Sequence, residues 1–417
     1  MPLNNLQTRF VIVTVSGEDK PGVTSALTGI LQLFDCEILD ISQSVIHDQL
    51  SLSFIVEIPQ EQKENDLLKE LLFKAHELRL QIHFNALDSA EYASWVSQEK
   101  TSRFIITILG RRILARPVHK ISQILAQNNL NISDLGRLSQ RIPLGLKDPN
   151  SKACMEIKVT GEASDLDRIR KEFLEISKEE DVDIAIQVDD VYRRNRRLVA
   201  FDMDSTLIQT EVIDELAMRA GSGVLVKSIT EAAMRGEIDF DESLRQRVST
   251  LKGLPESVMK EIADTLPVTE GAQYLVQTLK KFGYKVAVIS GGFTYFGNHL
   301  KDLLGLDYVF ANELEIIDGV LTGNVLGTII NGNKKAEILK QLCDQEGIEP
   351  EQAIAVGDGA NDLPMLSLAG LGIAFHAKPI VREKAQASMS QVGLDGILYL
   401  MGFRDREIRA LNLSDFV

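Results

Sequence analysis

The chain has 417 residues, of which 44% are hydrophobic, 25% charged and 6% aromatic, a globular composition that argues against long disordered stretches. Acidic residues outnumber basic ones by 60 to 45, so the formal net charge of −15 argues against a broad basic face for nucleic acid or anionic lipid. At about 150 residues per domain, the length predicts two to four domains.

The three cysteines, Cys36, Cys154 and Cys343, have a spacing that fits neither a disulfide framework nor a zinc knuckle. We therefore expect small buried hydrophobic residues in a reducing cytosol. The N-terminus lacks the basic start and long apolar stretch of a signal peptide, and no apolar run approaches the roughly 18 residues that a membrane helix needs. These features predict a soluble cytoplasmic protein with no membrane partner.

The first hundred residues predict the order β-α-β-β-α-β, as in ferredoxin-like folds. Gly22 after Pro21 marks a tight turn between the first strand and the first helix. The expected strands cover 9–15, 37–44, 50–58 and 79–85, and the expected helices cover 23–34 and 65–78.

The same order recurs after a separating stretch at 88–101. Strands are expected over 104–109, 131–140, 153–160 and 182–188, and helices over 117–127 and 164–179. "RFVIVTVSG" in the first copy corresponds to "RFIITILGR" in the second, a repeat of roughly 95 residues that indicates a duplicated domain rather than a solenoid. The basic run 193–197 ends the second copy, and we interpret it as a solvated linker.

From Leu198 onward, short apolar runs alternate with helical patterns, which predicts a parallel sheet covered by helices on both faces. The expected strands lie in 198–204, 285–292, 307–314, 327–330, 353–362 and 371–375. Polar residues cluster just past several strand ends, where open α/β sheets place their ligands.

Two acidic residues follow the first of these strands. Asp202 and Asp204 lie two residues apart after the apolar run 198–201, so both can face one site. A carboxylate can attack phosphorus, and a second carboxyl can protonate the leaving alkoxide and then deprotonate a water. The alternative is a polar turn or a helix cap.

Phosphate-binding groups follow later strands. Ser290 precedes Gly291 and Gly292, and a hydroxyl with backbone N–H groups can hold a phosphoryl oxygen, although a Gly-Gly pair is also an ordinary turn. Lys334 and Lys335 open a helix, where one of them could neutralise phosphate charge or both could form a solvated face. Physical reasoning leaves the choice between these two lysines open.

A third acidic element is Asp358, in the glycine-containing segment that follows the run 353–356. Together with Asp202 it could complete an oxygen-only Mg²⁺ site, and on its own it could form a calcium-like loop or a turn.

In this order, the four elements resemble the haloacid dehalogenase superfamily of phosphohydrolases. The resemblance implies that Asp202 is the nucleophile and Asp204 the general acid/base. It also implies Mg²⁺ held by the Asp202 side chain, the Asp204 backbone carbonyl and the Asp358 side chain.

The same resemblance also implies which residues bind the phosphoryl group. It implies that Ser290, Gly291 and Lys335 bind the transferring group, which selects Lys335 over its neighbour, and that Asp362 supports the site. Phosphoryl transfer requires in-line positioning and charge neutralisation, which these residue types can supply.

The insertion at about 209–268 reads as helices that could form a cap. Segments such as "DMDSTLIQTEVIDELA" and "VISGGFTYF" look like the phosphoserine phosphatases of this superfamily. The resemblance places Glu211 on the substrate ammonium, Arg247 on its carboxylate, Met234 and Phe240 as shields, and Asn361 near the phosphate. Without this resemblance, Glu211 could equally be a charge at the start of a helix and Arg247 a surface arginine. Met234 and Phe240 could equally be core residues.

The duplicated front half resembles ACT domains, which often bind amino acids and pair edge to edge. In the first copy Asp19, Gly22 and Val23 could meet an amino-acid carboxylate, and serine is the effector that the resemblance suggests. The second copy has Gly110-Arg111-Arg112 at the matching place and lacks the Pro-Gly turn, so a pure scaffold is an equal interpretation there. A homodimer through these domains is expected.

We therefore expect an α/β chain with ACT-like domains at 1–90 and 101–190 and a haloacid dehalogenase-type domain at 196–417. The expected activity is Mg²⁺-dependent hydrolysis of O-phosphoserine, the last step of serine biosynthesis. Three alternatives remain: a phosphotransferase acting on an alcohol, an amino-acid sensor with an inactive catalytic domain, and a nucleic-acid-binding regulator. The intact carboxylates argue against the second, and the net charge argues against the third.

Overall fold

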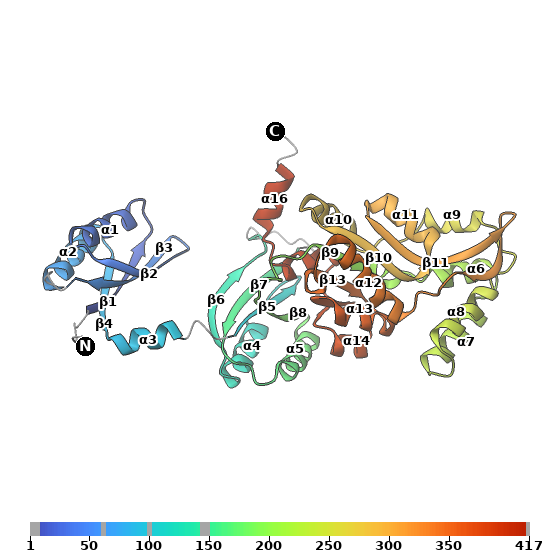
Figure 1. Ribbon diagram of the computed structural model, residues 1–417, viewed down its shortest axis with the longest axis horizontal. Coiled ribbons are helices and arrows are strands. Elements are labelled where there is room, and N and C mark those ends of the chain that lie inside the picture. Colours follow the sequence, from blue (N-terminus) through green and yellow to red (C-terminus); the bar gives the residue numbers. More distant parts are fainter. Residues whose placement is uncertain (1–8, 60–63, 98–101, 142–150, 414–417) are drawn as a thin grey trace, which may run out of the picture. The chain divides into compact units, whose positions relative to one another are not determined.

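The computed structural model describes residues 9–59, 64–97, 102–141 and 151–413. The chain divides into two compact units, residues 1–101 and 102–417, which are treated separately below (Figure 1). Residues 1–8, on which the expectation of a missing leader partly depends, lie outside the described residues. Within the described residues, no helix is long and apolar enough to cross a membrane.

The first unit has the expected β-α-β-β-α-β order and an antiparallel four-stranded sheet, arranged β2-β3-β1-β4. Alternate residues of its first strand, Val11, Val13 and Val15, are buried against Leu27 and Leu67 of the two helices, so one face of the sheet forms the core. The separating stretch contains a helix, α3. The elements are β1 (Arg9–Glu18), α1 (Val23–Leu33), β2 (Glu37–Ile46), β3 (Gln49–Ile58), α2 (Glu64–Glu77), β4 (Gln81–Leu87) and α3 (Ser89–Ser97).

The second unit begins with the second copy of this fold, with sheet order β6-β7-β5-β8. Ile106 and Ile108 pack towards the helices, as in the first copy. Leu109 and Cys154 face the other way and join the core of the C-terminal part, so this sheet is buried on both faces. The elements are β5 (Arg103–Gly110), α4 (Ala115–Gln127), β6 (Asn131–Arg137), β7 (Ala153–Thr160), α5 (Leu166–Glu180) and β8 (Asp183–Val188).

The basic run at 193–197 is not a solvated linker, as we had expected. Arg193 and Arg196 are buried, and the guanidinium of Arg193 pairs with Glu156 of β7 at 2.7 Å. The second copy packs directly on the C-terminal part, and two of the four arginines of the run, Arg193 and Arg196, lie in the seam between them.

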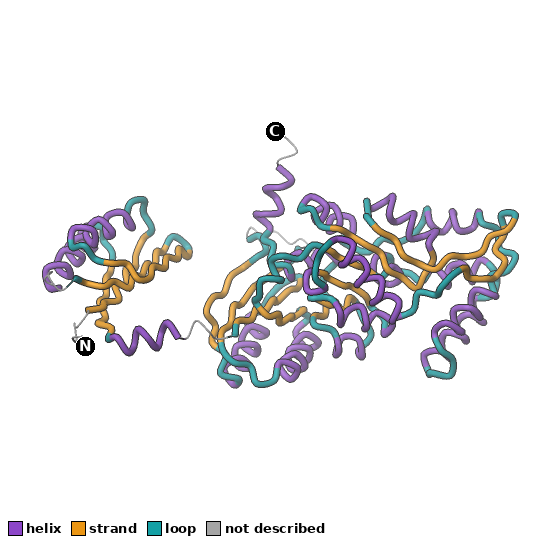
Figure 2. Tube along the Cα trace, in the orientation of Figure 1, coloured by secondary structure: helices purple, strands orange, loops and turns teal. Residues whose placement is uncertain are grey.

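The C-terminal part is built on a seven-stranded sheet, ordered β12-β11-β10-β9-β13-β14-β15 and parallel except for β12. Figure 2 shows its strands in orange among the purple helices that cover them. Alternate residues of the central strand separate the two layers. Val199 and Phe201 pack with α10 and α11, whereas Leu198 and Ala200 pack with α12, α13 and α14. The strands are β9 (Leu198–Phe201), β10 (Lys285–Phe293), β11 (Tyr308–Ile317), β12 (Val320–Leu326), β13 (Ala353–Gly357), β14 (Leu371–Phe375) and β15 (Ala387–Met389).

The helices of this part include four in the insertion at 209–268, as predicted. Ile208 and Val268 form an antiparallel bridge where the insertion leaves and rejoins the sheet. The insertion holds α6 (Val212–Arg219), α7 (Gly223–Met234), α8 (Phe240–Ser249) and α9 (Ser257–Ala263). The others are α10 (Ala272–Lys281), α11 (Thr294–Leu304), α12 (Gly332–Glu346), α13 (Leu363–Leu368), α14 (Pro379–Lys384), α15 (Ile397–Leu400) and α16 (Asp405–Leu413).

One predicted strand was wrong. Residues 327–330 do not form a strand, and the chain forms β12 just before them as a hairpin with β11. Residues 320–324 alternate between partly buried or exposed positions and the buried Leu321 and Gly323, as an antiparallel edge strand requires. The segment 327–330 is too short to show such an alternation in its sequence.

Candidate active site

A cavity of about 690 Å³ lies between the carboxyl ends of the central strands and the helices of the insertion. Because parallel strands end at one edge, β9, β10 and β13 deliver their polar loops to the same place. The predicted residues that line the cavity are Asp202, Asp204, Glu211, Met234, Phe240, Arg247, Ser290, Gly291, Asp358 and Asn361. Lys335 and Asp362 lie directly behind its wall, fully buried.

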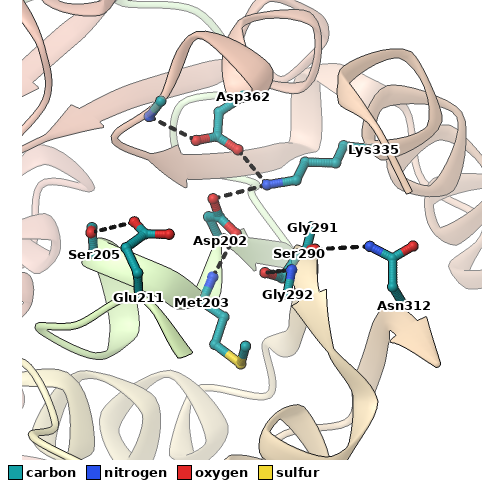
Figure 3. Close-up of polar contacts among 11 residues, drawn as sticks. Asp202, Met203, Ser205, Glu211, Ser290, Gly291, Gly292, Asn312, Lys335 and Asp362 are labelled. Atoms are coloured by element: carbon teal, nitrogen blue, oxygen red, sulfur yellow. Dashed lines mark hydrogen bonds and ion pairs between the residues drawn. The ribbon is translucent and has the colours of Figure 1, made fainter. Parts of the chain in front are cut away.

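Asp202 is held in place from three sides (Figure 3). Its backbone N–H donates to the carbonyl of Val356 at 2.8 Å, which ties β9 to β13. One carboxylate oxygen accepts from the N–H of Met203 at 2.7 Å, and the other lies 2.9 Å from Nζ of Lys335. This carboxylate is buried and oriented before any ligand arrives.

The structure distinguishes the two adjacent lysines. Lys334 is partly exposed and its Nζ pairs with Glu337 at 2.8 Å. Lys335 is fully buried, and its Nζ bridges Asp202 and Asp362, the latter at 2.6 Å (Figure 3). Burial alone would lower the pKa of Lys335, but the two carboxylates outweigh it and raise the pKa above its usual value, so this lysine is a fixed positive charge.

Asp204 faces the cavity from the turn after β9. One of its carboxylate oxygens accepts from the N–H of Val212, at the start of α6, at 3.0 Å. Burial, followed by the neighbouring charge of Glu211, raises the pKa of Asp204 well above its ordinary value. A raised pKa favours the protonated form of this carboxyl group, in which it can act as an acid.

Ser205 makes the turn between Asp204 and the insertion. Its φ is +55°, in the left-handed region, and its hydroxyl donates to a carboxylate oxygen of Glu211 at 2.8 Å (Figure 3). Glu211 immediately precedes α6 and is thereby held at the cavity by a residue of the first loop.

The Ser290 loop is fixed by a residue that sequence reasoning did not single out. The hydroxyl of Ser290 accepts from the N–H of Gly292 at 2.9 Å, and the amide of Asn312 donates to the carbonyl of Gly291 at 2.8 Å (Figure 3). Asn312 in turn accepts from the N–H of Ile330 at 2.8 Å. A Cβ on Gly292 would lie 2.5 Å from a carboxylate oxygen of Asp204, so glycine is required where the two loops meet.

Carboxylate oxygens of Asp202, Asp358 and Asp362 lie within 4.8 Å of one another, close enough to surround one cation. Burial, followed by the nearby charge of Asp202, raises the pKa of Asp358 to about 7. The carboxylate of Asp362 already accepts from Lys335 and from the N–H of Gly359 at 3.0 Å. The oxygen-only donor set fits a hard divalent cation such as Mg²⁺, with Asp362 as a supporting residue.

The insertion supplies the opposite wall. Arg247 of α8 is half-buried, and its Nε donates to the carbonyl of Ser243 at 3.3 Å. Burial lowers the pKa of Arg247, and the charges of Glu211 and Asp214 partly offset that change. A Cβ on Gly291 would lie 3.0 Å from the ring of Phe240, so that ring reaches the Ser290 loop. Met234 lines the cavity but is 65% exposed.

Two further charged residues line the cavity and were not predicted. Asp214 is on α6 beside Glu211, and Lys378 follows β14 with its N–H 3.4 Å from the carbonyl of Asp358. Lys378 could have been predicted in the same way as the other site residues, because it is a charged residue just past a buried strand. Asp214 offered no such signal because acidic residues are common at helix starts.

The residues proposed for regulation lie in the first unit. Asp19, Gly22 and Val23 line a hollow of about 320 Å³ together with Gln43 of β2. Gly22 has φ +93° and immediately precedes α1, where the sequence predicts a tight turn.

Comparison with known proteins assigns each segment to a family. A haloacid dehalogenase-like hydrolase family matches residues 196–370, and ACT domain families match residues 9–85 and 102–187. Phosphoserine phosphatase SerB2 of Mycobacterium tuberculosis is 40% identical over 406 residues, 97% of this chain and 96% of that protein. A phosphoserine phosphatase of Streptomyces coelicolor is 38% identical over 403 residues, covering 96% and 94%.

Solved structures give the same fold. The crystal structure of a haloacid dehalogenase family hydrolase of Salmonella enterica serovar Typhi superposes with a TM-score of 0.61 at 34% identity. The match covers 71% of this chain and 98% of that one.

Proposed function

Since this chain belongs to the phosphoserine phosphatases of the haloacid dehalogenase superfamily, we propose that it hydrolyses O-phosphoserine through a phosphoaspartate on Asp202, with Mg²⁺ as its cofactor. The observation that carries this proposal is the buried Asp202 carboxylate, oriented by Lys335 and facing a cavity with Asp204 beside it.

The reaction has two steps. A carboxylate oxygen of Asp202 attacks phosphorus, the bond from phosphorus to the seryl oxygen breaks, and that oxygen takes the proton of Asp204 as serine leaves. Asp204, now ionised, removes a proton from a water that attacks the phosphoaspartate. The phosphorus–Asp202 bond breaks, which releases phosphate and restores both carboxyl groups. The raised pKa of Asp204 supports its role as the acid of the first step.

Positive charge and N–H donors stabilise the transferring group. Lys335 Nζ lies 2.9 Å from Asp202 and would also pair with the phosphoryl oxygens, while Ser290 and the N–H of Gly291 would bind those oxygens from β10. The side chains of Asp202 and Asp358 and the carbonyl of Asp204 would hold Mg²⁺, which supplies further positive charge when bound. Asn361 lines the same end of the cavity.

The insertion would select the seryl part of the substrate. Arg247 can bind a carboxylate through two parallel N–H donors, and Glu211 can accept from an ammonium group. Both line the cavity opposite the aspartates. Phe240 and Met234 would shield the reacting atoms from water. For Met234, which is 65% exposed, this role requires the helices of the insertion to close further over a bound substrate.

The front half would regulate and assemble the enzyme, in a three-domain organisation of 1–90, 101–190 and 196–417. The hollow around Gly22 supports binding of an amino acid such as serine in the first copy. Exposed apolar side chains on the edge strand β2, among them Ile41, Val45 and Ile46, support pairing with a second copy of the chain.

The test is phosphate release from O-phosphoserine by the full chain. Wild-type protein is expected to release phosphate with Mg²⁺ and to lose that activity in excess chelator. Asp202→Asn is expected to be inactive yet folded, because the amide cannot form the phosphoaspartate but fills the same space. Wild-type-like release by Asp202→Asn, with its folding checked by circular dichroism, would contradict the nucleophile assignment.

A further inference from the structure

A second, smaller cavity of about 130 Å³ lies at the seam between the second ACT copy and the haloacid dehalogenase part. Arg170 of α5 and Gln187 of β8 line one side, Arg196 lies in the connecting segment, and Glu351 and Gln386 come from the C-terminal part. It shares no lining residue with the catalytic cavity or with the hollow around Gly22.

The wall of this cavity contains a buried guanidinium group with unused donors. Arg196 is 4% exposed, and its Nη2 donates to the side-chain oxygen of Gln187 at 3.1 Å. Its Nε and Nη1 have no hydrogen-bond partner within the described part of the chain. Gln187 is held in turn, because its amide donates to the carbonyl of Leu400 at 2.9 Å. Buried donors that lack a partner are rare and costly, so this arginine needs an explanation.

A second arginine and two carboxylates complete the lining. Nε of Arg170 also has no partner among the described residues, although its Nη1 pairs with Asp167 at 2.8 Å. Asp190 and Glu351 bring two negative charges to the same wall. The cavity therefore offers donors for an oxyanion and acceptors for a cation, with no net charge of its own.

The size of the cavity restricts the ligand further. Drug-sized ligands occupy roughly 300–1,000 Å³, and a water takes about 30 Å³, so this space suits a molecule of a few non-hydrogen atoms. We infer that the junction cavity binds a small α-amino acid, whose carboxylate meets Arg196 and Arg170 and whose ammonium group meets Asp190 and Glu351.

Such a ligand would lie at the base of the strand that carries the nucleophile. Arg197 donates its backbone N–H to the carbonyl of Gln352 and accepts from the N–H of Lys285, both at 2.8 Å, so it starts the pairing of β9 with both neighbours. Asp202 follows five residues later at the other end of β9. A ligand that orders Arg196 would therefore stiffen the seam and the start of this strand together.

Hydrogen–deuterium exchange on the full chain tests the site independently of phosphatase activity, with L-serine as the probe. Exchange over residues 186–197 is expected to slow as L-serine is added. Arg196→Gln is expected to raise the half-saturating concentration about tenfold or more, since a charged hydrogen-bond donor is lost. Arg194→Gln, whose side chain is 72% exposed in the same run, should behave like wild type.

The outcomes separate the alternatives. Slowing confined to residues 15–30, or no slowing at all, would overturn the site. Slowing by inorganic phosphate but not by L-serine would overturn the amino-acid assignment in favour of a simple oxyanion. If Arg196→Gln does not fold, the same exchange measurement is made on Arg170→Gln, whose side chain is partly exposed. An unchanged response to L-serine in that variant would refute the inference.

Discussion

At the scale of single residues, the active site depends on charges fixed before substrate arrives. Lys335 is buried between Asp202 and Asp362, and the proton on Asp204 is favoured by burial and by Glu211. Water reorganisation contributes little in such a site, because the protein already supplies the dipoles and charges that the transition state needs.

Arg247 provides a prediction about substrate choice. Arg247→Ala is expected to lower kcat/KM for O-phosphoserine roughly ten- to a hundredfold, since a charge-assisted hydrogen bond to the substrate carboxylate is lost. Hydrolysis of p-nitrophenyl phosphate, which lacks that carboxylate, should change little. Arg245→Ala, on the exposed side of the same helix, is the matched control. Equal losses on both substrates would remove Arg247 from carboxylate recognition.

Sequence patterns predicted the residues that follow buried strands, because such positions converge at one sheet edge whatever the details of packing. They did not predict Asn312. That side chain acts from inside β11, where its neighbours in sequence say nothing about the loop across the sheet that it contacts. The burial of Arg196 was also unpredictable, since a basic run is usually solvated unless another domain covers it.

At the scale of elements, the phosphate-binding segment at the carboxyl end of β10 is held by the neighbouring strand β11. Asn312 links the carbonyl of Gly291 to the N–H of Ile330, so two loops depend on one buried amide. The position of Ser290 therefore depends on β11, an element that carries no reacting group.

Removing that amide should loosen the loop. Asn312→Ala is expected to lower kcat about tenfold, because two buried hydrogen bonds of about 1 kcal/mol each are lost. Asn312→Asp, which keeps the acceptor for Ile330 but cannot donate to Gly291, should retain the fold and still lose activity. Glu313→Ala, at the exposed neighbouring position, serves as the control for steady-state assays. Full activity in Asn312→Asp would show that the loop needs no such support.

Strand β8 carries a buried acid at the seam. The carboxylate oxygens of Asp183 accept from the N–H groups of Ser390 and Gln391 at 2.8 and 2.9 Å, and burial raises the pKa of Asp183 from 3.8 to about 7. The folded state therefore holds this proton more tightly than the unfolded chain. The contribution of Asp183 to the free energy of unfolding falls as pH rises from about 4 to about 7, then stays constant.

Asp183→Asn removes this pH dependence, since the amide does not titrate. The melting temperature of the variant relative to wild type is expected to rise between pH 4.5 and pH 7 and to level off above. Thermal unfolding from pH 4.5 to 8.5 provides the measurement. Asp181→Asn, at an exposed position beside it, should show a constant difference. A difference in melting temperature between Asp183→Asn and wild type that stays constant with pH would rule out titration of Asp183 in this range.

At the scale of the whole molecule, the two copies of the duplicated fold have different surroundings. In the first copy, one face of β1 carries the buried valines, whereas β5 in the second copy is buried along almost its whole length. The sequence predicted the same element order for both copies, and both first strands are rich in β-branched residues. Whether one or both faces of such a sheet are buried depends on which other parts of the chain pack against it, and the sequence of the strands alone does not show this.

Two truncations follow from this difference. A chain that starts at residue 102 is expected to remain folded and active, because the first unit has its own core. A chain that starts at residue 196 bares the surface that packs on β5, β7 and β8, so its melting temperature should fall by about 10 °C or more. Thermal unfolding and size-exclusion chromatography check both, and an equally stable 196–417 fragment would contradict this account of the seam.

The sheet of the second copy, which is packed on both faces, also limits which substitutions the duplicated segment can accumulate. Each side chain on β5, β7 or β8 faces either the helices of its own copy or the catalytic part, so substitutions on both faces of these strands disturb a packed core. Substitutions should therefore accumulate more slowly on these strands than on the corresponding strands of the first copy.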